Sequence, residues 1–276
     1  MVNAFWIIIA GSLVAASCAL PGCFLLLRRQ SLVGDAISHA ILPGIAIAYL
    51  FFGRNPWVIW ISATCFGLFS TILMDWIHYK TKLQADTAIG VVFTFFFAIG
   101  IILVSFFAGN VDIDQECVLY GEIAYIPLEN KWLGVPVSIW RQLILLVFII
   151  AAISIFYKQF LITTFDEEFA KLSGFQTTVW HYALMGIVSL ATVVSFEAVG
   201  AILVISFLVV PAAIAFLLAH RLISMLIISV IVSIIISFAG YWLAIAFNAS
   251  IAGAMAVVSG ISFIVIWMYE KIKKIN

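Results

Sequence analysis

The sequence has very little charge: 9% of its 276 residues are Asp, Glu, Lys or Arg, whereas 66% are hydrophobic. A water-soluble domain of this composition would expose large apolar patches. The mean hydropathy of +1.25 therefore excludes an ordinary soluble protein. Apolar stretches recur with lengths near the ~20 residues that cross a hydrocarbon core about 30 Å thick. We predict an all-α integral membrane protein, a polytopic bundle of transmembrane helices surrounded by lipid.

Phosphate-binding and catalytic motifs are also missing. The sequence contains no GxxxxGK[ST] loop, so we do not expect the chain to hydrolyse ATP by itself. It contains no HExxH, GxSxG or CxxC motif, and its four cysteines lack metal-ligand spacing. An arginine ladder and a TVGYG-like filter are absent too, which argues against a voltage sensor or a potassium channel. We expect no enzymatic activity, no permanently bound cofactor and no nucleic-acid partner.

The hydropathy pattern predicts nine spans in one transmembrane domain, residues 1–276. The ambiguous joint is Glu197 to Gly200, because the stretch from Ala183 to Ala219 is almost unbroken; a single helix there would leave eight spans. The predicted spans are residues 5–27, 36–52, 57–77, 86–108, 141–157, 179–196, 199–219, 223–246 and 249–268.

Basic residues predict the orientation of these spans, because lysine and arginine collect on the cytoplasmic side. The nine-span arrangement leaves only Arg54, Lys131 and Arg141 outside. It places the N-terminus outside and the C-terminus in the cytoplasm. The remaining basic residues then lie inside: Arg28, Arg29, Lys80, Lys82, Lys158, Lys171, Arg221, Lys271, Lys273 and Lys274.

Two connections between spans are long. The external one, at about 109–140, carries several acids and one lysine, and it either attracts cations to the outer mouth or is simply a solvated loop. The cytoplasmic one, at about 158–178, contains a short predicted helix that Thr164 or Asp166 would cap and Gly174 would end. Its acidic face would be repelled by anionic lipid, so we expect it to bind a protein partner. The acids of the external loop are Asp112, Asp114, Glu116, Glu122 and Glu129.

Asp35 and His39 are an unusual pair within an apolar stretch. Four residues make about one turn of an α-helix, so both side chains project from the same face. A carboxylate with an imidazole suits manganese, iron or zinc. Alternatively, Asp35 caps the helix and His39 packs inside the bundle. The two residues alone leave both interpretations open.

Other candidate residues are weaker. Asp86 begins a span and Glu197 lies near the outer end of another; each could meet a metal ion, or could act as a helix cap or a solvated acid. Pro43 and Gly44 follow the Asp35–His39 pair within two turns, and a proline kink there would free carbonyl oxygens, or would serve packing alone. Pro211 is expected to kink a later span. We assign no role to the histidines at predicted helix ends: His78, His181 and His220.

Several stretches in order along the chain carry a family resemblance. They are RRQSLVGDAISHAILPGIAIAYL (28–50), ADTAIGVVFTFFFAIGIILVS (85–105), ECVLYGEIAY (116–125), FDEEFAKLSGF (165–175) and VGAILVISFLVVPAAIAFLLA (199–219). Together they resemble the permease subunits of ATP-binding-cassette importers for manganese, zinc and iron. The resemblance runs through most of the chain.

This resemblance implies a permease of the bacterial plasma membrane that moves a divalent metal ion inward by alternating access, with manganese or iron slightly preferred to zinc. It implies a separate ATPase subunit, an extracytoplasmic metal-binding protein, and a second copy or a paralogous permease. Asp35 and His39 would be transient metal ligands. A gradient-driven secondary cation transporter and a non-transporting membrane scaffold are the alternatives. The residues that would contact the ATPase are Asp166, Glu167, Ala170 and Gly174.

Overall fold

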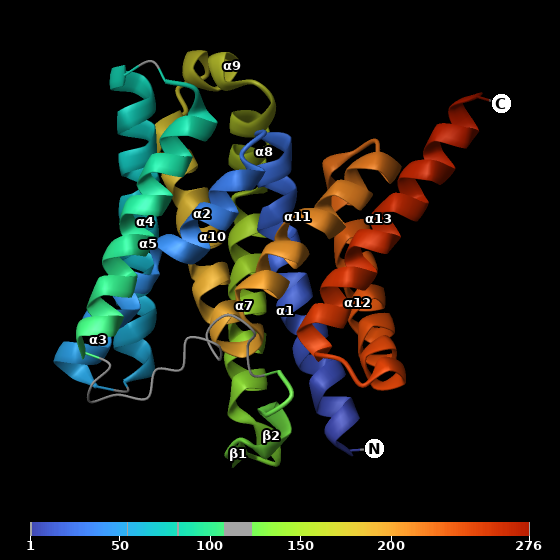
Figure 1. The fold of residues 1–276 in the computed structure, drawn as a ribbon. Coiled ribbons are helices and arrows are strands. Elements are labelled where there is room, and N and C mark those ends of the chain that lie inside the picture. Colours follow the sequence, from blue (N-terminus) through green and yellow to red (C-terminus); the bar gives the residue numbers. More distant parts are fainter. Residues whose placement is uncertain (1, 54, 82, 108–122, 276) are drawn as a thin grey trace.

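The computed structural model describes residues 2–53, 55–81, 83–107 and 123–275. Within these ranges the chain forms a helical bundle whose N-terminus lies at one end, with α9 and the C-terminus at the other (Figure 1). Nine helical segments of the described residues are long and apolar enough to cross a membrane. The predicted all-α membrane architecture is therefore confirmed.

The helices are α1 (Val2–Leu27), α2 (Ser31–Ala40), α3 (Leu42–Phe52), α4 (Pro56–Thr81), α5 (Ala85–Phe107), α7 (Val137–Ile155), α8 (Tyr157–Phe165), α9 (Glu167–Leu172), α10 (Thr177–Val199), α11 (Ala201–Leu218), α12 (Leu222–Phe247) and α13 (Ile251–Ile275). A 3₁₀ turn, η2 (Ile126–Leu128), precedes the short antiparallel strands β1 (Lys131–Trp132) and β2 (Val135–Pro136).

The structure separates the two spans at the ambiguous joint. Gly200 has φ +80° between α10 and α11, a backbone conformation that glycine adopts without steric cost. The second predicted span, 36–52, was wrong in extent: it begins at Ser31 and consists of two helices, α2 and α3. The loop predicted at about 109–140 ends earlier, because α7 begins at Val137. Four of its acids lie outside the described residues: Asp112, Asp114, Glu116 and Glu122.

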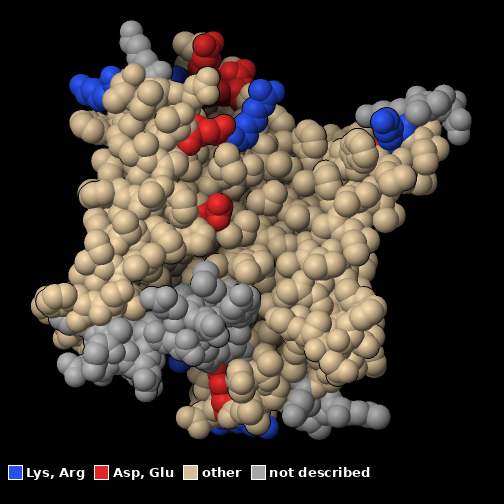
Figure 2. Space-filling model, viewed as in Figure 1, with Lys and Arg blue, Asp and Glu red and all other residues tan. Residues whose placement is uncertain are grey.

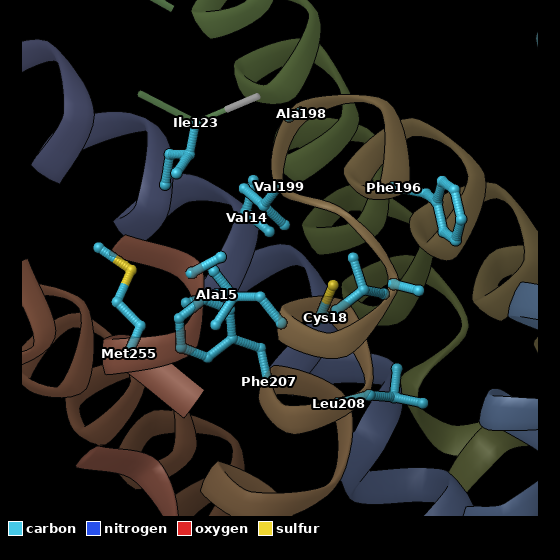
Figure 3. Close-up of a cluster of buried hydrophobic side chains, with 14 of the residues drawn as sticks. Val14, Ala15, Cys18, Ile123, Phe196, Ala198, Val199, Phe207, Leu208 and Met255 are labelled. Atoms are coloured by element: carbon cyan, nitrogen blue, oxygen red, sulfur yellow. The ribbon is translucent and has the colours of Figure 1, made fainter. Parts of the chain in front are cut away.

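The core of the bundle surrounds α1, which packs against α7, α10, α11 and α12. Val14, Ala15 and Cys18 of α1 are fully buried beside Phe207 of α11 and Met255 of α13 (Figure 3). By contrast, the outer faces of α5, α12 and α13 carry many exposed apolar side chains. Figure 2 shows charged side chains gathered at the two ends of the bundle, with an almost uncharged band between them. This distribution is typical of a protein surrounded by hydrocarbon.

A glycine of α1 allows that helix to approach α11 closely. A Cβ atom at Gly22 would overlap the backbone carbonyl of Leu208. A backbone atom cannot move aside as the end of a flexible side chain can. The α1–α11 contact at the centre of the bundle therefore depends on the absence of a side chain at this position.

We expect Gly22→Ala to destabilise the fold by about 1–3 kcal/mol, the usual effect of overpacking a close-packed contact. Thermal unfolding of the purified chain in detergent, monitored by the loss of helical signal, measures the effect. Gly260→Ala is the matched control, because a Cβ there would meet nothing within 4 Å. Equal stability of the two variants would contradict the close approach.

Candidate functional site

The Asp35–His39 pair lies on α2, which packs against α4, α5 and α10. The Oδ1 atom of Asp35 is 3.5 Å from the Nε2 atom of His39, so the two side chains converge as the spacing predicts. Asp35 is the fifth residue of α2, whose N-cap is Gln30, so the alternative in which Asp35 caps the helix is wrong. The Asp35 side chain is 44% exposed and that of His39 is 21% exposed. An ion could therefore reach both.

Two aromatic rings of α5 hold the His39 imidazole. The ring centroids of Phe93 and Phe97 are each 5.2 Å from that of His39, one tilted and one edge-on. Aromatic contacts of this geometry restrict the rotation of the imidazole and shield part of it from water. They position its Nε2 atom toward Asp35.

A break in the helix follows the pair directly. Pro43 has no N–H group, so it cannot donate a hydrogen bond to the carbonyl of His39, four residues earlier. The helix is interrupted at Ile41, and α3 begins at Leu42 with Pro43 in its first turn. Gly44 lets α3 contact α4, where the hydroxyl of Ser62 donates to the Gly44 carbonyl at 2.8 Å. The backbone N–H of Ile41 contacts the carbonyls of both His39 and Ile37, so the break changes the partner of the His39 carbonyl and does not leave it free.

The other predicted kink does not interrupt its helix. Pro211 lies inside α11, which continues to Leu218. Pro211 is also buried.

The two weaker metal candidates have different surroundings. Glu197 accepts a hydrogen bond from Arg141 at 2.8 Å and another from the indole N–H of Trp60 at 2.8 Å. Its carboxylate thus joins α10 to α7 and α4, and a metal ion there would have to displace an arginine. Asp86 lies in the first turn of α5 and lines a cavity of 160 Å³ together with Asp75 and His78. Among the described residues, no three His, Cys, Asp or Glu side chains form a group that could hold a metal.

The short helix predicted in the region 158–178 is α9. Asp166 is its N-cap: the Oδ1 atom accepts a hydrogen bond from the backbone N–H of Phe169 at 2.8 Å. Glu167 forms an ion pair with Lys171 at 2.7 Å, and this contact lowers the pKa of the Glu167 carboxyl. Gly174, with φ +82°, follows the end of the helix, a conformation that favours glycine.

Ala170 corrects an expectation for this helix. We predicted contact between Ala170 and a partner, but its side chain is fully buried, so it holds α9 against the rest of the chain instead. The apolar residues that α9 presents outward are Phe169 and Leu172, of which Leu172 is 88% exposed, and Glu167 and Glu168 are exposed beside them. These apolar groups beside two acids form the exposed face of α9.

Sequence reasoning missed a polar cluster near α9. His181, expected to be solvated, lies with its Nε2 atom 3.1 Å from the Asp75 carboxylate and its Nδ1 atom 3.4 Å from a guanidinium nitrogen of Arg28. Asp75 and His181 both belong to membrane-spanning helices, where an ionisable residue calls for a partner. The sequence shows that these ionisable residues lie within spans, but only the fold brings Arg28, α4 and α10 together.

Known proteins resemble this chain in both sequence and fold. Residues 1–270 match the ABC 3 transport family. The chain is 42% identical over 263 residues to the manganese transport system membrane protein MntD of Bacillus subtilis, covering 94% of this chain and 89% of that protein. It is 36% identical over 270 residues to the zinc transport system membrane protein TroD of Treponema pallidum, covering 96% and 73%. A solved structure of PsaBC from Streptococcus pneumoniae in complex with Fab has a TM-score of 0.82 at 32% identity, covering 95% of this chain and 90% of that one.

Replacing Pro43 tests the helix break. Pro43→Ala restores an N–H group that can donate to the His39 carbonyl, so we expect α2 and α3 to merge and thermal stability to remain equal or rise. Binding of Mn²⁺ to the purified chain, measured by calorimetry, should weaken at the same time because the Asp35–His39 pair is redirected. Pro211→Ala is the control, since α11 is already continuous there. Unchanged Mn²⁺ affinity in Pro43→Ala would show that the break is not part of the site.

Proposed function

Because this chain belongs to the ABC 3 transport family, we propose that it is the membrane-spanning subunit through which an ATP-driven importer moves a divalent metal ion into the cell. The observation that supports this proposal most strongly is the Asp35–His39 pair, converging on one face of α2 beside a broken helix. Transporters build their midplane sites from interrupted helices of this kind. The ion is cargo and not a resident cofactor.

The chemistry of the Asp35 and His39 donor atoms limits which metal ions the site can bind. One carboxylate and one imidazole suit manganese, iron and zinc, and exclude ions that demand only oxygen ligands. The relatives named for manganese and zinc support these two metals, with manganese first because MntD has the higher identity. Iron has the same donor preferences and remains the third member of the substrate class.

A second permease copy completes the path. Two side chains from one chain leave most coordination positions of the ion open. A matching pair from a second copy, or from a paralogous permease, would supply four ligands. Such a site binds an ion strongly enough to select it and weakly enough to release it. An extracytoplasmic metal-binding protein would deliver the ion to this site.

A separate ATPase subunit docks on α9 in this proposal. The exposed apolar side chains of Phe169 and Leu172, with Asp166 and Glu167 beside them, fit a cleft that has an apolar floor and basic edges. Gly174 lets the chain turn away from α9. ATP binding would draw the two ATPases together and tilt the permease subunits, which alternates access to the metal pair.

The α9 end of the bundle is the cytoplasmic end. Figure 1 places the C-terminus at this end and the N-terminus at the opposite end, in agreement with the orientation expected from the basic residues. In this proposal the protein lies in a bacterial plasma membrane with its N-terminus outside. A gradient-driven secondary transporter is not favoured, because the matched family is the ABC 3 transport family.

Asp35→Ala and His39→Ala should each abolish ATP-dependent uptake of ⁵⁴Mn²⁺ into proteoliposomes that contain the assembled transporter. Each substitution removes one of the two proposed ligands, while the complex should still assemble, as judged by size-exclusion chromatography. Competition by Zn²⁺ and Fe²⁺ in the same assay ranks the substrates.

The matched controls remove the same chemistry elsewhere. His220→Ala deletes an exposed imidazole after α11, and Glu270→Gln neutralises a carboxylate on α13. Both controls should transport normally. Normal uptake by Asp35→Ala together with His39→Ala would refute the proposed metal path.

Asp166→Ala removes the N-cap of α9 at an expected cost of about 1 kcal/mol to a six-residue helix. We expect weaker binding of the ATPase subunit, measured as the fraction that remains on an affinity-tagged permease during washing. Asp166→Asn is the control, because an amide oxygen can still accept the hydrogen bond from Phe169. If Asp166→Asn weakens binding as much as Asp166→Ala, charge rather than helix capping is responsible.

A further inference from the structure

The connection between α1 and α2 is short and rigid. Arg29 has φ +57°, and its backbone N–H donates to the Leu26 carbonyl at 3.0 Å, while that of Gln30 donates to Leu25 at 2.9 Å. These two bonds form a Schellman motif, which closes a helix end in one defined geometry. Gln30 is then the N-cap of α2. Because the connection is short and hydrogen-bonded, a displacement of this corner also displaces α2 and the Asp35–His39 pair.

Arg28, the first residue of this corner, holds its side chain toward α8. Its Nε atom donates to the Thr164 hydroxyl at 3.1 Å, and one terminal nitrogen donates to the Thr163 hydroxyl at 3.1 Å. Both threonines lie within three residues of Asp166, the N-cap of α9. The guanidinium is thus hydrogen-bonded to α8, the helix that directly precedes the proposed docking helix α9.

The other terminal nitrogen of Arg28 points toward α10. It lies 3.4 Å from Nδ1 of His181, whose Nε2 atom is 3.1 Å from the Asp75 carboxylate of α4. A neutral imidazole satisfies both contacts: Nδ1 accepts from the guanidinium, and the protonated Nε2 donates to the carboxylate. Three acceptors arranged around one planar fork suit arginine and not lysine.

Arg28 keeps its charge at neutral pH although its side chain is largely buried. Burial lowers the pKa of the guanidinium to about 10, and the nearby Glu167 carboxylate of α9 acts in the opposite direction. The group is therefore protonated at neutral pH. Its side chain and those of Thr163, Thr164, Glu167 and His181 line a polar cavity of 430 Å³. This space gives the contacts room to rearrange, which close packing would not.

We propose that Arg28 is the positioning residue that transmits movement of α9 to the metal-binding helix α2, through its bonds to Thr163 and Thr164 on one side and to the His181–Asp75 pair on the other. The inference rests on the proposed function, since it takes α9 as the ATPase contact and α2 as the metal helix. Movement of α8 and α9 pulls the guanidinium, and the Schellman corner passes that pull to α2. The His181–Asp75 pair anchors the guanidinium to α10 and α4 in the resting position.

The test measures coupling in the complete transporter in proteoliposomes, as Mn²⁺ ions imported per ATP hydrolysed. Arg28→Gln should lower this ratio about tenfold, the size of a typical coupling between two sites. Binding of Mn²⁺ to the complex should persist, because Asp35 and His39 are intact. Arg28→Lys, which keeps the charge and loses the fork, should give an intermediate ratio. The matched control is Arg221→Gln, which removes an exposed charge outside this corner and should leave the ratio unchanged.

A second variant covers the case in which Arg28→Gln does not assemble. The double variant Thr163→Val, Thr164→Val removes both hydroxyl acceptors at nearly constant volume and should also lower the ratio. The inference is overturned if this variant and any assembled Arg28→Gln keep the ratio of the unmodified transporter, or if Arg221→Gln lowers it equally. The two proposals fail separately. An unmodified complex that imports no Mn²⁺ on ATP hydrolysis refutes the proposed function, whereas normal coupling in the variants refutes only the role of Arg28.

Discussion

The requirement that every backbone polar group in hydrocarbon finds a partner underlies the whole structure. It makes each crossing of the membrane a helix, and it makes any interruption of a helix costly unless the interruption lies within the bundle. The interruption at Ile41 meets this condition, because α2 and α3 are covered by α4 and α5. Pro43 cannot donate to the His39 carbonyl, which the backbone N–H of Ile41 contacts instead, in a place that protein, rather than lipid, surrounds. The candidate metal site and the break are one feature.

Two parts of the bundle are held together by different kinds of contact, close packing around α1 and hydrogen bonds near α9. At the centre, small residues such as Gly22 bring α1 and α11 into backbone contact, so this part of the bundle is closely packed. Near α9, Arg28, Asp75 and His181 join helices through hydrogen bonds that border a cavity. Hydrogen bonds to water or to new partners can replace such contacts, whereas a buried apolar interface cannot be exchanged in this way. A transporter needs both kinds of region, one that stays intact and one that changes.

Local patterns predicted most of the fold and half of the candidate site. Hydropathy over about twenty residues located the spans, and the four-residue spacing of Asp35 and His39 placed them on one helix face. The capping role of Asp166 was also correct, because capping depends on neighbours three residues away. The start of the second span was wrong, because the polar residues Ser31 and Asp35 before Ala36 lower its hydropathy although they belong to α2. His181 was dismissed because its partners, Arg28 and Asp75, are more than one hundred residues away in the chain.

The sequence by itself determined that the chain lies in a membrane, where its helices run, and that Asp35 and His39 share one helix face, because each of these depends on composition or on spacing within one helix. Tertiary structure alone decided that Glu197 is held by Arg141 and Trp60, that Ala170 faces inward, and that Arg28 lies between α8 and α10. These outcomes depend on which helices become neighbours. Neighbouring helices are chosen by the summed packing of many apolar surfaces, which no short stretch of sequence contains.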